Sequence, residues 1–213
     1  MKIDETTRTL FFASIIAVIF DFARFYIGGT IGPLYLIWNL FLAWIPYVLS
    51  FFFAKKDMSL NYFLPIFFLW LLFFPNAPYL VTDVLHLASR LSPLLWYDGL
   101  LFFFFGWLGL LLGMLSLFQI HQYFKNRFNY LISELAILGI CFVASVGVYL
   151  GRFERWNSWD VFINPFQLLK HSLIVSNSFL NSGSALVFVI VFSVFMYAVY
   201  RTIYFIKIET NQK

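Results

Sequence analysis

The sequence predicts an all-α fold, a polytopic membrane helix bundle of about six transmembrane helices that forms one integral membrane domain over residues 1–213. Two observations carry this prediction. Hydrophobic residues make up 62% of the chain and charged residues only 11%, whereas soluble domains carry roughly 25% charged residues. The apolar residues also fall in runs of about 20, the length that an α-helix needs to cross the hydrocarbon core. Lipid must therefore solvate most of this chain.

Six apolar runs are long enough to cross a bilayer. They cover roughly residues 9–30, 33–54, 59–76, 97–119, 129–150 and 179–206. Two of these runs carry stripes of small residues that predict close helix packing within the chain. The fourth run has Gly106, Gly109, Gly113 and Ser116, and the fifth run together with the residue after it has Ala144, Gly147 and Gly151.

The segment after the third run predicts a short amphipathic or re-entrant helix over residues 78–91, at the outer face of the membrane. Proline disfavours helical geometry in the residue before it, so Phe74 and Ala77 are expected to leave the helix and Pro78 to begin a new one. Polar residues recur at Tyr79, Asp83, His86 and Arg90, a spacing that places them on one helix face. A second such stretch is predicted over residues 161–176.

The positive charges predict the orientation. With six crossings, nine Lys and Arg residues lie on the side of the termini and five on the other side. The smaller set is Arg24, Arg90, Arg152, Arg155 and Lys170. Because loops that stay in the cytoplasm are richer in Lys and Arg, both termini are expected to be cytoplasmic. The net charge of +4 falls in short patches and not in a basic domain, which argues against a nucleic-acid partner.

Several ionisable and amide side chains fall inside or at the edge of the spans. Asp21 and Arg24 share a face of the first helix and are expected to neutralise one another. Asp98, in the first turn of the fourth helix, is explained by the helix dipole. Asn39 and Glu134 have no evident local partner and are expected to be buried between helices.

Asp83 and His86 are the first candidate site, because residues three apart share a helix face and Glu154 could approach them across the outer mouth. One imidazole with several carboxylates can bind a divalent metal or act as a general acid–base pair. A hydrogen-bonded structural pair is the favoured alternative. The chain has no HExxH, GxSxG or phosphate-binding-loop signature and a single cysteine, so no catalytic motif and no cofactor is identified.

The second candidate site is a polar and aromatic segment after the fifth run. It contains Arg152, Arg155, Trp156, Asn157, Trp159 and Asp160. Arginine presents a fork of donors that fits phosphate, and tryptophan anchors at the level of lipid headgroups, so headgroup or partner binding is one interpretation. The other is an interfacial belt in which the arginines pair with Glu154 and Asp160.

Three blocks of the sequence resemble a bacterial family of membrane proteins, domain of unknown function 1361. The blocks are residues 74–83 with His86, residues 96–98, and residues 151–160. The likeness extends from about the second predicted helix into the last one. It implies a bacterial multi-pass membrane protein and supplies no catalytic residues.

Three functional hypotheses stay open. The first is a membrane scaffold or lipid-contacting protein whose outer polar face binds lipid headgroups or an envelope protein. The alternative is an outer-leaflet enzyme that acts on a lipid-linked or cell-envelope substrate through Asp83, His86 and Glu154. A small transporter is less favoured, because few charges fall within the spans and the two halves show no clear repeat. The only candidates for its pathway are Asp21, Arg24, Asn39 and Glu134.

Overall fold

The computed structural model of the chain describes residues 5–28, 34–54, 59–89, 94–156, 158, 163 and 183–211. These parts of the chain are helical and contain no β-strand. The elements are α1 (Glu5–Gly28), α2 (Tyr35–Ser50), the 3₁₀ helix η1 (Phe51–Ala54), α3 (Leu60–Phe73), α4 (Asn76–Thr82), the 3₁₀ helix η2 (Asp83–Ser89), α5 (Leu95–Lys125), α6 (Tyr130–Phe153) and α9 (Ser184–Asn211).

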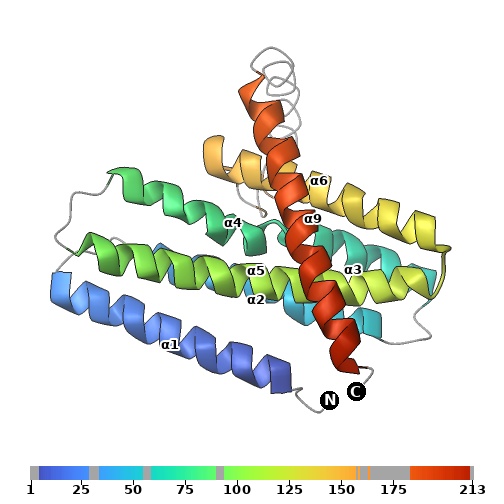
Figure 1. The fold of residues 1–213 in the computed structure, drawn as a ribbon, viewed down its shortest axis with the longest axis horizontal. Helices are drawn as coiled ribbons and strands as arrows, with labels where there is room; N and C mark the ends of the chain where they lie inside the picture. Colours follow the sequence, from blue (N-terminus) through green and yellow to red (C-terminus); the bar gives the residue numbers. More distant parts are fainter. Residues whose placement is uncertain are drawn as a thin grey trace.

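Six described segments are long and apolar enough to cross a membrane, which confirms the predicted all-α multi-pass bundle. They are Glu5–Ile27, Tyr35–Phe53, Asn61–Leu87, Leu95–Lys125, Tyr130–Phe153 and Ser184–Glu209. Helices α1, α2 and α5 run alongside one another, whereas α9 crosses the bundle steeply (Figure 1). The first turn of α1 and the last turns of α9 meet at the same end, where Lys207 Nζ donates to Thr6 Oγ1 at 3.4 Å.

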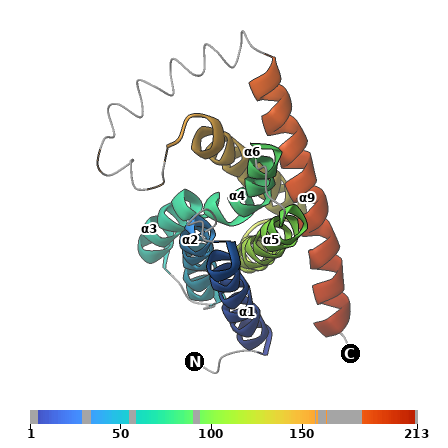
Figure 2. The ribbon, with the colours of Figure 1, turned by 90° about the vertical axis from the view of Figure 1, so that its left-hand side faces the viewer.

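Helix α5 is the centre of the bundle. Viewed along the bundle, α5 lies among α1, α2, α4, α6 and α9 (Figure 2), and it packs against each of them. Its most apolar window is 67% buried, against 22% for the corresponding window of α9. The chain then turns into α6, which begins where the Asn129 side chain accepts a hydrogen bond from the Ile132 N–H at 2.8 Å.

The predicted stripe of small residues on α5 is the surface against which α4 packs. A Cβ added at Gly109 would lie 2.5 Å from the Ala77 carbonyl oxygen, and one at Gly106 would lie 3.3 Å from the Leu80 carbonyl oxygen. Gly113 faces the Ala77 methyl group in the same way, at 3.0 Å. The absence of side chains at these positions lets the two backbones approach closely, as expected for small-residue helix contacts.

Helix α6 closes over the other side of the same segment. A Cβ at Gly147 would lie 2.7 Å from the Pro75 ring, and one at Gly151 would lie 3.2 Å from the Tyr79 ring. Ala144 is fully buried in the neighbouring turn. The small residues on both helices therefore pack within this chain, as the sequence predicts.

The expectation that Phe74 and Ala77 leave helical geometry is wrong. Phe74 and Pro75 both keep right-handed helical dihedrals, with φ, ψ of −55°, −40° and −58°, −25°, and Ala77 lies inside α4. Pro78 is the third residue of α4 and not its first. The bias against helix before proline is modest, and the close contact of α4 with the α5 glycines offsets it.

The segment over 78–91, for which a surface or re-entrant helix is predicted, begins with residues packed against other helices. Ala77, Pro78, Leu80, Thr82 and Asp83 are buried, and the third crossing continues through this segment to Leu87. Of the polar stripe, Asp83 is buried, Tyr79 and His86 lie beside Arg152 of α6, and Arg90 lies outside the described residues. The second amphipathic stretch, predicted over 161–176, lies outside the described residues apart from Ile163.

Candidate functional site

Arg152, in the last turn of α6, joins three polar residues of α4 and η2. Its Nε donates to Thr82 Oγ1 at 2.9 Å, and its Nη2 donates to Asp83 Oδ1 at 2.5 Å. Its Nη1 lies 2.8 Å from His86 Nε2. The guanidinium also stacks over the Tyr79 ring, 4.1 Å from the ring centre. Arg152 therefore connects α6 to both α4 and η2.

Helix α2 completes this group through Asn39, whose Nδ2 donates to Asp83 Oδ2 at 3.2 Å. We call the six residues Asn39, Tyr79, Thr82, Asp83, His86 and Arg152 the arginine network. The Arg152 and Asp83 side chains are only 6% and 1% exposed. Each of the two charges is therefore neutralised by the other, because neither side chain is exposed to solvent.

The predicted convergence of Asp83 and His86 occurs, and Arg152 is the residue that joins them. Both Asp83 oxygens already accept hydrogen bonds, from Arg152 and Asn39. An arginine has only donors, so His86 Nε2 must be the acceptor and the proton of a neutral ring must sit on Nδ1. This arrangement orients the imidazole, but it occupies the atoms that a general base or metal ligand would use.

Glu154, the third candidate of this site, is the residue that ends α6, where its N–H donates to the Leu150 carbonyl at 3.1 Å. Within the described parts of the chain, no three His, Cys, Asp or Glu side chains come together as a metal site would require. The hypothesis of a metal at Asp83 and His86 therefore gains no third ligand from the described residues.

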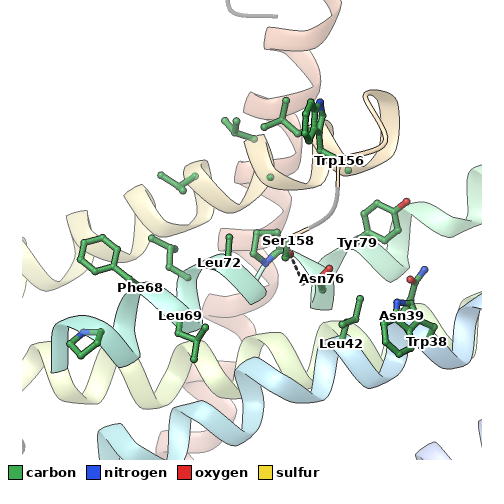
Figure 3. Close-up of a pocket in the computed structure, with 18 residues that line it drawn as sticks. Trp38, Asn39, Leu42, Phe68, Leu69, Leu72, Asn76, Tyr79, Trp156 and Ser158 are labelled. Carbon is green, nitrogen blue, oxygen red and sulfur yellow. Dashed lines mark hydrogen bonds between the residues drawn. The ribbon is translucent and has the colours of Figure 1, made fainter. Parts of the chain in front are cut away.

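A groove of about 770 Å³ lies beside the arginine network, between α2, α3, α4 and α6. Apolar side chains line most of it, among them Leu42, Phe68, Leu69 and Leu72, which project from α2 and α3 (Figure 3). Its polar lining consists of Asn39, Asn76, Tyr79, Trp156 and Ser158. The dashed line in Figure 3 is the hydrogen bond from Asn76 Nδ2 to Ser158 Oγ, at 2.8 Å. The groove is thus amphipathic.

The segment after α6 supplies the rim of this groove. Arg155 is exposed and adopts a left-handed conformation with φ 59°, and the Trp156 N–H returns to the Leu150 carbonyl at 3.2 Å. This turn places Trp156 against the groove. Asn157, Trp159 and Asp160, also predicted for this site, lie outside the described residues.

A second polar group, which we call the α9 network, joins α5, α6 and α9. Arg201 Nη1 donates to Glu134 Oε1 at 2.7 Å, and the Tyr197 hydroxyl donates to Glu134 Oε2 at 3.2 Å. His121 Nδ1 lies 2.5 Å from the Tyr200 hydroxyl, and its Nε2 is 3.8 Å from Glu134 Oε1. Glu134 is buried between helices as predicted, but nothing in the sequence indicated its partners.

Arg24 and Asp98 form a third ion pair, which is buried between α1 and α5. Arg24 Nε and Nη2 donate to the two carboxylate oxygens of Asp98, at 2.6 Å and 3.1 Å. Asp98 lies in the first turn of α5 as predicted. However, its carboxylate is fully buried and engaged by Arg24, so the dipole alone does not explain this residue. Asp21 is buried one turn before Arg24.

Comparison with known proteins gives a family and no function. No curated protein and no solved structure matches this sequence. The model of one family, described as a protein of unknown function (DUF1361), matches residues 38–199. That range contains the arginine network, the lining of the groove, and all three sequence blocks that carry the resemblance. Because the match covers most of the chain, this multi-pass membrane protein belongs to the DUF1361 family.

Proposed function

We propose that this protein binds a membrane lipid in the groove between α2, α3, α4 and α6. The observation that carries the proposal is the amphipathic groove of about 770 Å³, which lies among segments that are apolar enough to span the bilayer. Ligand pockets usually have volumes of roughly 300–1,000 Å³. Apolar side chains from α3 would contact the acyl chain, and the polar lining would contact the head group.

The arginine network has a structural role in this proposal. It connects α2, α4 and α6, three of the four helices that line the groove, because Asn39 and Arg152 both bond to Asp83 and Arg152 also bonds to Thr82 of α4. An enzymatic role for Asp83 or His86 is less favoured, because both side chains already bond to Arg152. A fixed network of this kind would keep the groove open without a bound ligand.

We further propose that the polar end of the groove is extracytoplasmic and that both termini are cytoplasmic, in a bacterial plasma membrane. The excess of Lys and Arg on the side of the termini supports this orientation. Fusion of a fluorescent protein and of alkaline phosphatase after residue 213 tests it. Fluorescence without phosphatase activity is the expected result, and the opposite pattern would reverse the orientation.

Filling the groove tests lipid binding. Val143 lies on the exposed side of α6 and lines the groove, so Val143→Trp would occupy the groove without disturbing the buried core. Val194→Trp in α9 is the matched control, because Val194 is exposed but does not line the groove. Native mass spectrometry in mild detergent should show retained lipid for the wild type and for Val194→Trp, and much less for Val143→Trp. Equal retention by both variants would contradict the proposal.

A further inference from the structure

We infer that the lipid in the groove carries an uncharged head group rich in hydroxyls, as the sugar of a glycolipid is, an inference that rests on the proposed function. The first argument is charge. Among the described residues that line the groove, none is Asp, Glu, Lys or Arg. Anionic head groups are usually bound by arginine or lysine donors.

The arginine that stacks on Tyr79, a residue of the groove lining, already has its own partners. Three N–H groups of Arg152 are directed to Thr82, Asp83 and His86, and its flat face covers the Tyr79 ring. Asp83 neutralises its charge in a buried ion pair. A phosphate that took the place of Asp83 would leave that carboxylate buried without a partner, which is costly.

The second argument is the hydrogen-bonding capacity that remains in the groove. Asn76 uses its Nδ2 for the Phe73 carbonyl and for Ser158 Oγ, and Asn39 uses its Nδ2 for Asp83. These bonds fix the orientation of both carboxamides, since a carbonyl or carboxylate can only accept. Asn76 is left with its oxygen as an acceptor, and Asn39 keeps its oxygen and one N–H. Phosphate oxygens are acceptors too, so they would not bond to these two carboxamide oxygens.

The remaining polar groups of the groove can donate. The Tyr79 hydroxyl forms no hydrogen bond with the described residues, and the Ser158 hydroxyl accepts from Asn76 while its own proton stays available. Two acceptors beside two hydroxyl donors match a ligand whose groups both donate and accept, as sugar hydroxyls do. The indole of Trp156 adds an apolar surface against which the C–H face of a sugar ring can pack.

A lipid competition experiment tests this inference. The purified protein in detergent is mixed with equal amounts of diglucosyl-diacylglycerol, phosphatidylglycerol and phosphatidylethanolamine with identical acyl chains, and binding is measured by native mass spectrometry. The wild type should prefer the glycolipid. Tyr79→Phe keeps the ring under Arg152 but removes the hydroxyl, and should weaken glycolipid binding by roughly 2- to 10-fold, the effect of one hydrogen bond, without changing phosphatidylglycerol binding.

Two controls separate the possible outcomes. Tyr62→Phe removes an exposed hydroxyl from α3 that does not line the groove, so it should leave the preference unchanged. Ser158→Ala provides a second loss of a donor if Tyr79→Phe purifies poorly. A preference for phosphatidylglycerol or phosphatidylethanolamine that Val143→Trp abolishes would overturn the inference and leave the proposed function intact. Binding of all three lipids that is insensitive to Val143→Trp would overturn both.

Discussion

Helices α4 and α9 both carry polar residues into the bundle, but the bundle holds them differently. Helix α4 lies against the glycine face of α5 and under α6. The ion pair at its end, between Arg152 of α6 and Asp83 of η2, is only 6% and 1% exposed. Helix α9 crosses the outside of the bundle, and the Arg201 and Glu134 side chains of its network are 23% and 10% exposed. The same two functional groups are thus desolvated to different degrees.

This difference separates a fixed contact from an adjustable one. When both members of an ion pair are buried, removal of one leaves an uncompensated charge in a medium of low dielectric. A partly exposed pair loses less, because lipid headgroups or water can solvate the remaining group. We therefore expect the arginine network to set the geometry of the groove, and the α9 network to contribute less to stability.

The largest expected effect is that of Arg152→Leu, which should lower the free energy of unfolding by about 3–5 kcal/mol, because it leaves Asp83 buried without its partner. Unfolding of the detergent-solubilised protein by a denaturing surfactant measures the change. The double variant Arg152→Leu/Asp83→Leu should recover much of the loss, since it removes both charges. A loss no greater than that of Arg201→Leu would show that the two networks are equivalent.

The packing of α4 against the α5 glycines can be disrupted by a substitution that changes no charged residue. Gly109→Ala would place a methyl group 2.5 Å from the Ala77 carbonyl oxygen, and the backbone can relieve this only by moving α4. We expect a loss of about 1–3 kcal/mol in the same unfolding assay. Gly139→Ala in α6 is the control, because no atom lies within 4 Å of its added Cβ, and it should be neutral or stabilising by up to about 1 kcal/mol. Equal stability of both variants would contradict the close packing of α4 on α5.

A smaller effect is expected in the α9 network. Arg201→Leu removes the 2.7 Å hydrogen bond to Glu134, but Tyr197 still donates to the other carboxylate oxygen. The loss should be about 1.5 kcal/mol, the lower end of the range for one hydrogen bond to a charged group, because the pair is partly exposed. The variant Arg201→Lys should keep part of this contribution, which distinguishes a charge effect from lost packing on Phe205. A loss as large as that of Arg152→Leu would mean that the exposure of the pair does not decide its contribution.

The smallest effect is a gain. Arg155 adopts a left-handed conformation with φ 59°, which costs an L-amino acid roughly 1–2 kcal/mol. Arg155→Gly should therefore stabilise the end of α6 by up to about 1 kcal/mol, after the greater freedom of glycine in the unfolded chain is subtracted. Arg155→Lys keeps the charge and the strain, and its stability should be unchanged. If Arg155→Gly is less stable than Arg155→Lys, the arginine side chain contributes contacts that outweigh the strain.

The sequence predicted more of the scaffold than of the contacts. The apolar runs located the six helices that are long and apolar enough to cross a membrane, to within a few residues at most ends, because hydropathy depends on the residues of one segment. The small residues of α5 and α6 also identified packing faces correctly, since a missing side chain can be recognised in any sequence. The prediction that Phe74 and Ala77 leave helical geometry was wrong. The backbone preference before proline was outweighed by the contacts of this segment with Gly106 and Gly109, about 30 positions away along the chain.

The candidate site shows the same division. That Asp83 and His86 share a face follows from their spacing, and the structure places both on Arg152. Nothing local indicates that Asn39 would bond to Asp83 or that Asp98 would pair with Arg24, 74 residues away. The roles predicted for Arg155 and Trp156 in headgroup or partner binding stay predictions.

The sequence by itself determined that this protein is a helical membrane protein and which stretches cross the bilayer, because lipid acts on each apolar stretch independently of the others. Only the tertiary structure decided which charges neutralise one another and where a groove remains. Those outcomes depend on the depth and rotation of each helix against its neighbours. The small-residue contacts and steric fit of the whole bundle set that depth and rotation.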